Sequence, residues 1–125
     1  MTVLLDTNAF IRWLTGVPLP KPAERVLQKA DTKMYLSVVS VWEIVMKPRL
    51  GISALQAEAA VHEMGAVLLP IRIRHLDELS RLALNGDHKD PFDRLLISQA
   101  LAEGFAIVSS DDRFPAYGRL TVLWD

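Results

Sequence analysis

Five short apolar runs, each separated from the next by helix-like segments, constrain the fold of this chain more than any other feature. They are residues 2–5, 34–37, 67–71, 105–109 and 121–124. Their side chains are apolar at successive positions and do not alternate with polar ones, so strands made from them would be buried on both faces. Such strands, alternating with helices, indicate a parallel sheet that is covered by helices on both sides. We therefore expect an α/β fold with about four to five short parallel strands.

The segments between these runs carry start and stop signals for helices. We expect helices over residues 8–14, 22–30, 41–46, 54–64, 75–84 and 91–103. The expected N-caps are Asp6 or Thr7, Ser40 and Ser53, the last in a capping box with Gln56. The expected stops are Gly16, Pro48, Asn85-Gly86 and Gly104.

Bulk composition narrows the class of protein. We expect the 125 residues to form a single domain over residues 1–125, and a hydrophobic content of 50% argues against disorder. The absence of cysteine excludes disulfides and thiolate metal sites and suits a cytoplasmic location. The chain shows no signal peptide and no run of roughly 20 apolar residues, so we expect no membrane contact. A net charge of −1 argues against a general nucleic-acid coat, but not against an enzyme with a local nucleic-acid site.

The segment 88–100 contains the clearest helix start in the chain. Asp90 is an N-cap residue and Pro91 occupies the first helical position, where its missing N–H costs nothing. In the helix that follows, Asp93 lies close to the apolar stripe and away from the face opposite it. A carboxylate turned toward apolar surface is costly unless it is paired, hydrogen-bonded or bound to a cation. Asp93 also has a simpler interpretation as the acid of a capping box.

Three more acids stand at unusual places. Asp6 ends the first apolar run, Asp111 closely follows the fourth, and Glu43 lies among apolar residues in an expected helix. Each has a structural alternative: Asp6 as an N-cap, Asp111 and its neighbour Asp112 as turn residues, and Glu43 as a surface acid paired with Lys47.

Taken together, the four acids can converge, because the carboxyl ends of parallel strands lie at one edge of the sheet. Clustered carboxylates repel and raise one another's pKa, and divalent cations relieve that repulsion. Oxygen ligands favour Mg²⁺ or Mn²⁺, whereas the lack of thiolates and paired histidines disfavours Zn²⁺. One or two such ions can activate water against a phosphodiester.

Four motifs carry a family resemblance. They are Leu-Leu-Asp-Thr-Asn at 4–8, Ser-Val-Trp-Glu-Ile at 40–44, His-Lys-Asp-Pro-Phe-Asp-Arg-Leu-Leu-Ile at 88–97 and Ile-Val-Ser-Ser-Asp at 107–111. In this order and spacing they resemble the PIN-domain nucleases, and most of all the VapC-like toxins of bacterial toxin–antitoxin pairs. The resemblance implies a PIN-like three-layer α/β/α domain. Pro48 departs from the pattern, since it interrupts the helix just after Glu43.

The resemblance implies a Mg²⁺- or Mn²⁺-dependent endoribonuclease that hydrolyses RNA with metal-activated water. The residues that fall on the family's catalytic and metal-binding acids are Asp6, Glu43, Asp93 and Asp111. Asn8 and Ser109 fall on polar positions that support these acids. The resemblance further implies a cognate antitoxin protein as partner and a homodimer.

Several interpretations stay open. Arg94, His88 and Lys47 are candidates for substrate contact, although each also suits a solvated or bracing role. His62 and His75 are expected to be exposed helix residues. Two rival functions are another Mg²⁺-dependent phosphoryl-transfer domain, such as a phosphatase or receiver, and an inactive RNA- or protein-binding module. An aspartyl phosphatase would want an acid two residues after Asp6, where this chain has Asn8.

Overall fold

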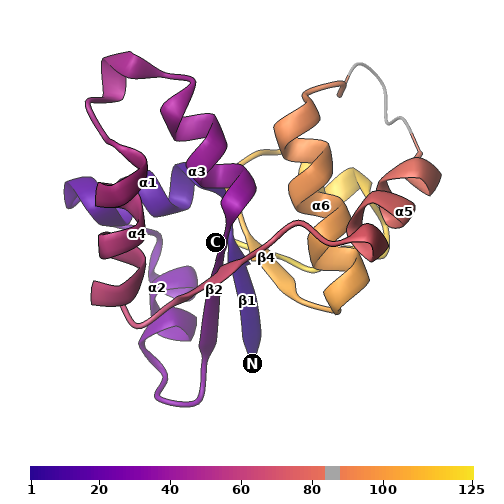
Figure 1. The fold of residues 1–125 in the computed structure, drawn as a ribbon. Helices are drawn as coiled ribbons and strands as arrows, with labels where there is room; N and C mark the ends of the chain where they lie inside the picture. Colours follow the sequence, from indigo (N-terminus) through magenta and orange to yellow (C-terminus); the bar gives the residue numbers. More distant parts are fainter. Residues whose placement is uncertain (84–87) are drawn as a thin grey trace.

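The computed structural model describes residues 1–83 and 88–125, which form three layers with a parallel sheet in the middle (Figure 1). Among these residues, five strands pair in the spatial order β3-β2-β1-β4-β5. The strands are β1 (Thr2–Leu5), β2 (Lys33–Ser37), β3 (Val67–Leu69), β4 (Ala106–Val108) and β5 (Val122–Leu123). The order changes direction between β1 and β4, and in such sheets ligands bind beyond the carboxyl ends of the strands at this point.

Helices cover both faces of the sheet. They are α1 (Thr7–Thr15), α2 (Lys21–Gln28), α3 (Val38–Val45), α4 (Ala54–Glu63), α5 (Ile73–Arg81) and α6 (Pro91–Glu103), with short 3₁₀ turns at Pro48–Leu50 and Phe114–Ala116. In Figure 1, α1, α2 and α4 lie on one side of the sheet, and α5 and α6 lie on the other. The expected α/β/α fold is confirmed. Within the described residues, every helix is too short or too polar to cross a lipid bilayer.

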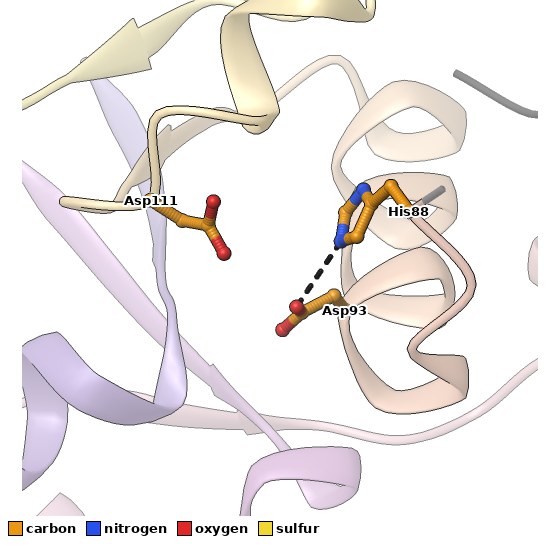
Figure 2. Close-up of side chains that lie close together, drawn as sticks. All are labelled: His88, Asp93 and Asp111. Carbon is orange, nitrogen blue, oxygen red and sulfur yellow. Dashed lines mark hydrogen bonds and ion pairs between the residues drawn. The ribbon is translucent and has the colours of Figure 1, made fainter. Parts of the chain in front are cut away.

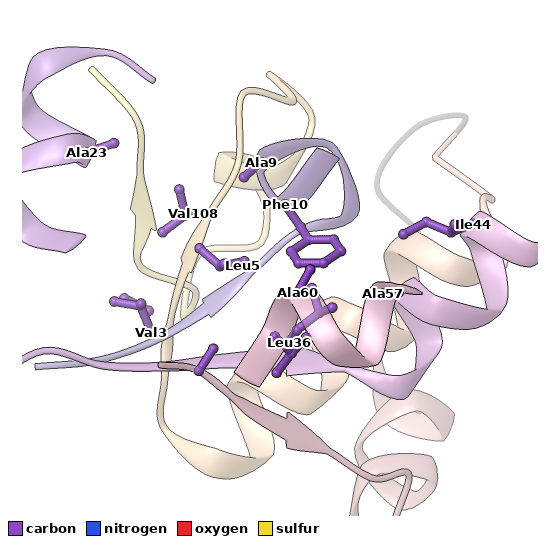
Figure 3. Close-up of a cluster of buried hydrophobic side chains, with 13 residues drawn as sticks. Val3, Leu5, Ala9, Phe10, Ala23, Leu36, Ile44, Ala57, Ala60 and Val108 are labelled. Carbon is purple, nitrogen blue, oxygen red and sulfur yellow. The ribbon is translucent and has the colours of Figure 1, made fainter. Parts of the chain in front are cut away.

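The central strands are buried on both faces, as their continuous apolar runs require. In β1, Val3 and Leu5 contribute to the core under α1, α2 and α4, whereas Leu4 contributes to the core under α6. Figure 3 shows the first of these cores, where Phe10 of α1 lies among side chains of the sheet and of α4. Since neither face of β1 meets water, its carboxyl end is held firmly, and the residues that follow it are placed accurately.

The expected Ser40 N-cap is wrong. The helix α3 begins directly after β2, and Ser37 is its N-cap, with the Ser37 hydroxyl accepting a hydrogen bond from the Val39 backbone N–H at 3.0 Å. Ser40 lies instead inside the helix, fully buried, and its oxygen accepts a hydrogen bond from the Thr7 hydroxyl at 2.9 Å. Because α3 follows β2 without a loop, the position of Glu43 in the helix is fixed relative to the sheet.

Several other boundaries differ from expectation. The third strand is shorter than the apolar run 67–71, and Val67 and Ile71 are exposed because β3 is at the edge of the sheet. The fifth helix is Ile73–Arg81 rather than 75–84, and the expected stop at Asn85-Gly86 lies outside the described residues. The second helix is Lys21–Gln28 rather than 22–30. Five other signals match: Asp6, Ser53 and Asp90 cap their helices, and Gly16 and Gly104 end theirs.

Candidate active site

Acids from four separate elements meet beyond the carboxyl ends of β1 and β4. Asp6 directly follows β1 and caps α1, Glu43 lies in α3, Asp93 lies in the first turn of α6, and Asp111 lies in the loop after β4. The backbone N–H of Asp6 also donates to the Val108 carbonyl at 3.0 Å, which ties the two strand ends together. The tertiary fold thus brings the four acids to one edge of the sheet.

Asp6 is the most deeply buried of these acids, with 7% of its surface exposed. The pKa of its carboxyl group is raised from 3.8 to about 6, mainly by burial and to a smaller extent by the nearby carboxylates of Asp93 and Asp111. Hydrogen bonds from the Ser109 side chain and from the Ala9 backbone, the latter at 2.7 Å, act in the opposite direction. The ionised form of Asp6 therefore destabilises the folded protein, as expected for a carboxylate that binds a ligand rather than one that supports the fold.

Asp93 and Asp111 face each other across the site, with His88 beside them (Figure 2). One ligand atom from each of these three residues lies within 4.8 Å of the others. Partial burial raises the pKa of Asp93, and the negative charges of Asp111 and Glu43 contribute to this, whereas the hydrogen bond with His88 lowers it. Asp93 consequently interacts with both of the acids that come from α3 and from the loop after β4.

Arg113 partly compensates the charge of this edge. Its guanidinium group binds Asp111 with Nε–Oδ1 and Nη2–Oδ2 distances of 3.0 and 2.7 Å, and it lies 3.7 Å from Oδ2 of Asp93. The bidentate contact lowers the pKa of Asp111 and raises that of Arg113. The sequence offered no sign of this role, because Arg113 stands two residues after Asp111 in a turn of unspecified shape.

Glu43 is the second buried acid, with 9% of its surface exposed. Its Oε2 atom accepts a hydrogen bond from Nζ of Lys47 at 2.9 Å. Its Oε1 atom is buried and has no hydrogen-bond partner among the residues that the structure describes. A buried carboxylate oxygen without a partner is costly, so it calls for an explanation. A divalent cation would provide one, and the oxygen-rich donor set around it is of the type that Mg²⁺ and Mn²⁺ prefer.

Comparison with known proteins assigns the family. The PIN domain model matches residues 3–120. The chain belongs to the PIN-domain family. No curated protein sequence matches this PIN domain.

Solved structures agree in fold with this PIN domain. VapBC-1 from nontypeable Haemophilus influenzae has a TM-score of 0.73 at 20% identity, covering 98% of this chain and 97% of that chain. VapBC2 from Rickettsia felis, bound to a DNA fragment from its promoter, has a TM-score of 0.71 at 16% identity, covering 100% of both chains. A toxin–antitoxin complex from Klebsiella pneumoniae has a TM-score of 0.66 at 14% identity, covering 97% of this chain and 95% of that chain.

The two predicted supporting residues differ in their surroundings. Ser109 is buried at the end of β4, where its hydroxyl group hydrogen-bonds Asp6 and accepts a bond from the Asp111 backbone N–H at 3.0 Å. It therefore connects two of the four acids. Asn8 lies exposed in the first turn of α1, two residues after Asp6. The supporting role of Asn8 stays a prediction.

The three candidates for substrate contact are all engaged within the PIN domain. Lys47 pairs with Glu43, and 38% of its side chain is exposed. Arg94 donates hydrogen bonds to the Leu82 carbonyl at 2.8 Å and the Ala83 carbonyl at 3.0 Å, and His88 is buried. Of the three, only Lys47 presents a cation at the rim of the acidic edge, whereas the contacts of Arg94 and His88 favour a bracing role.

Proposed function

We propose that this PIN domain is a metal-dependent endoribonuclease, the toxin of a toxin–antitoxin pair, which acts in the cytoplasm and comprises all 125 residues as a single domain. The observation that carries the proposal is the meeting of four acids from four elements, with one buried oxygen of Glu43 that has no partner in the described part of the chain. Repulsion between clustered carboxylates destabilises the folded protein unless a bound ligand compensates the charge. Toxin–antitoxin complexes among the structural neighbours support the choice of partner.

The residues that would hold one or two Mg²⁺ or Mn²⁺ ions are Asp6, Glu43, Asp93 and Asp111. All four present carboxylate oxygens, and the two that are nine-tenths buried, Asp6 and Glu43, come from the start of α1 and from α3. When bound, such an ion activates water for attack on the RNA phosphodiester and stabilises the charge on the leaving oxygen.

The chain's own residues prepare this site. Ser109 orients Asp6 and the backbone after β4, so that the strand-end acids keep a fixed separation. Arg113, which is 53% exposed at its side chain, neutralises Asp111 and Asp93 until another cation competes for them. Lys47, at the rim, offers a positive charge to the RNA backbone.

The neighbours also guide the proposal on partners. A separate antitoxin protein is expected to bind this domain, and we propose a homodimer as the assembled state. RNA is the proposed substrate, because a metal-dependent carboxylate site can act on phosphodiesters. The ends of the RNA products can be mapped directly.

The test is incubation of the purified protein with total RNA, in Mg²⁺ and in chelator, followed by mapping of the cut ends. We expect cleavage in Mg²⁺ only. We expect Asp93→Asn and Asp6→Asn each to slow cleavage by about 100-fold or more, because each removes a charged ligand.

The matched control is Asp31→Asn, which removes an exposed acid from the turn before β2, at the other end of the sheet. This variant should cut RNA at the wild-type rate. Wild-type cleavage by either Asp93→Asn or Asp6→Asn in Mg²⁺ would overturn the proposed function.

A further inference from the structure

We infer that His88 is a positioning residue: a hydrogen-bond chain that runs from Arg94 through Tyr117 to His88 holds the Asp93 carboxylate, and His88 itself binds neither ion nor RNA. The inference rests on the proposed function in one respect, namely that Asp93 is an ion ligand. The donor-to-acceptor direction of these hydrogen bonds can be measured whether or not the protein cuts RNA.

The chain consists of three contacts that connect the loop after β4 to the start of α6. Nη1 of Arg94 lies 3.3 Å from the Tyr117 hydroxyl oxygen. That oxygen lies 2.9 Å from Nδ1 of His88, and Nε2 of His88 lies 3.2 Å from Oδ2 of Asp93. His88 and Tyr117 are almost fully buried, at 1% and 4% exposure. Water therefore has little access to the central link.

The direction of each hydrogen bond follows from the donors available. A guanidinium group can only donate, so the Tyr117 oxygen accepts from Arg94. Tyr117 has a single hydroxyl proton, and among the described residues its acceptor is Nδ1 of His88. Nδ1 therefore carries no proton, and the ring proton of neutral His88 is on Nε2, from which it is donated to Asp93. The opposite tautomer would leave the buried Tyr117 proton without an acceptor among residues 1–83 and 88–125.

This polarity decides what His88 does. One of its ring nitrogens lies within 4.8 Å of carboxylate oxygens of Asp93 and Asp111, which is a spacing that a metal site also shows. A nitrogen that carries a proton has no lone pair to give to an ion, so His88 in this tautomer acts on Asp93 and not as a ligand. In Figure 2 the ring approaches Asp93 on the side away from Asp111. The bond holds Oδ2 of Asp93 and thereby orients its other oxygen.

The chain is anchored at its far end. Arg94 also donates to the backbone carbonyls of Leu82 and Ala83, just after α5, so its guanidinium group cannot rotate freely. The ring of His88 packs against Phe114, with a centroid distance of 5.8 Å, and edge-on against Tyr117, at 5.6 Å. Partners of this kind, which fix the orientation of a ligand without touching the ion, typically change metal affinity or activity 10- to 100-fold.

The first experiment measures the tautomer of His88 by long-range ¹H–¹⁵N NMR of the imidazole rings, without and with saturating Mg²⁺. We expect the proton on Nε2 in both conditions. Loss of the Nε2 proton on addition of Mg²⁺ would show that His88 is a ligand, and a proton on Nδ1 in the free protein would reverse the chain. Either result overturns the inference.

The second experiment measures Mn²⁺ affinity by calorimetry for variants of the chain. We expect Tyr117→Phe to bind Mn²⁺ about tenfold more weakly and to show His88 with part of its proton on Nδ1. The matched control is Tyr35→Phe, since Tyr35 lies in β2 with its ring stacked on Phe105 and takes no part in the chain. This control should bind Mn²⁺ like the wild type.

A pair of substitutions at His88 separates positioning from packing. His88→Gln keeps a donor and an acceptor about as far apart as the ring nitrogens, and we expect it to restore most of the Mn²⁺ affinity that His88→Leu loses. Equal affinity of the two variants would overturn the inference.

Absence of RNA cleavage by the wild type would refute the proposed nuclease activity but not the tautomer of His88. Unchanged Mn²⁺ affinity of Tyr117→Phe alongside normal cleavage would refute the positioning role alone.

Discussion

The first turn of α6 and its last turns each contact a buried histidine, His88 at the beginning of the helix and His75 of α5 near its end. At the beginning, His88 donates to Asp93, a carboxylate that faces other carboxylates. Near the end, Nε2 of His75 lies 2.8 Å from Oε2 of Glu103, a carboxylate that is also bound by Arg74. The same helix therefore presents one acid with excess negative charge around it and one acid with its charge balanced.

The network around His75 leaves none of its polar atoms without a partner. Nδ1 of His75 accepts from the Arg72 backbone N–H at 2.9 Å, so the ring proton is on Nε2 and points to Glu103. Gln99 donates to the Pro70 carbonyl at 3.3 Å and accepts from the Ser37 hydroxyl, which also caps α3. This network joins α5, α6 and the sheet.

The pKa values at the two ends of α6 move in opposite directions. Burial raises that of Asp93, whereas at Glu103 the hydrogen bonds from His75 and Arg74 and the positive charge of Arg74 outweigh burial and lower the pKa. The comparison teaches that a buried acid contributes to folding when donors and cations surround it, and burdens folding when other acids do. The acidic edge lowers the stability of the folded protein until a ligand binds it, whereas the His75 network raises that stability.

The largest expected effect is at His75. His75→Leu leaves the Arg72 N–H without its acceptor and removes one donor to Glu103, which keeps Arg74 as its other donor. It also takes away the fully buried ring that joins these groups. We expect the free energy of unfolding to fall by about 3 kcal/mol, measured by urea denaturation. The control His62→Leu changes an exposed histidine of α4 and should stay within about 0.5 kcal/mol of the wild type. Equal stability of His75→Leu and the wild type would show that the network is dispensable.

The next effect has the opposite sign. Asp6→Asn removes a buried charge but keeps an oxygen that can cap α1, so we expect the free energy of unfolding to rise by about 2 kcal/mol at pH 8 in chelator. The folded pKa of about 6 exceeds the usual 3.8, so the folded protein binds more protons between these values and loses stability as pH rises through them.

The gain from Asp6→Asn should therefore shrink between pH 6 and pH 4, since the wild-type carboxyl group is then neutral in the folded state. Saturating Mg²⁺ should also reduce it, because the ion binds the wild-type carboxylate and thereby stabilises the folded state. Lower stability of Asp6→Asn at pH 8 would contradict the contrast between the acidic edge and the His75 network.

A smaller effect is expected at Glu103. Its pKa is lowered in the folded state, so its contribution is present above the ordinary value of 4.5 and is lost as pH falls through the folded value. We expect Glu103→Gln to lose about 1 kcal/mol of stability at pH 7 and this difference to be smaller at pH 3. Urea titrations at the two pH values measure this, and a difference that persists unchanged at pH 3 would exclude the charge as its cause.

The smallest effect is expected at Lys47. Its ion pair with Glu43 joins residues four apart on α3, and its own side chain is 38% exposed. Lys47→Met should change the free energy of unfolding by less than about 0.5 kcal/mol, as is usual for pairs four residues apart on a helix when the lysine is partly exposed. A loss above 1 kcal/mol would mean that Lys47 is an essential counter-charge of the acidic edge.

Sequence patterns predicted most of the fold, because the relevant signals act between near neighbours. Asp90 followed by Pro91 starts α6, and Ser53 with Gln56 closes a capping box on α4. The continuous apolar runs predicted a sheet buried on both sides. In β1, Leu4 packs into one core and Val3 and Leu5 pack into the other. The same reasoning misplaced the start of α3 at Ser40, since both Ser37 and Ser40 are good caps and only the end of β2 distinguishes them.

The sequence by itself determined which side chains can act as ligands, and it brought Asp6 and Asp111 to the same edge, because parallel strands end together. Only the tertiary structure decided which partners they have. The contacts of His88 with Tyr117 and of Ser37 with Gln99 span 29 and 62 residues, and no local pattern specifies them. His75 was expected on the surface and is fully buried, since burial is set by what packs over a residue and not by its neighbours in the chain.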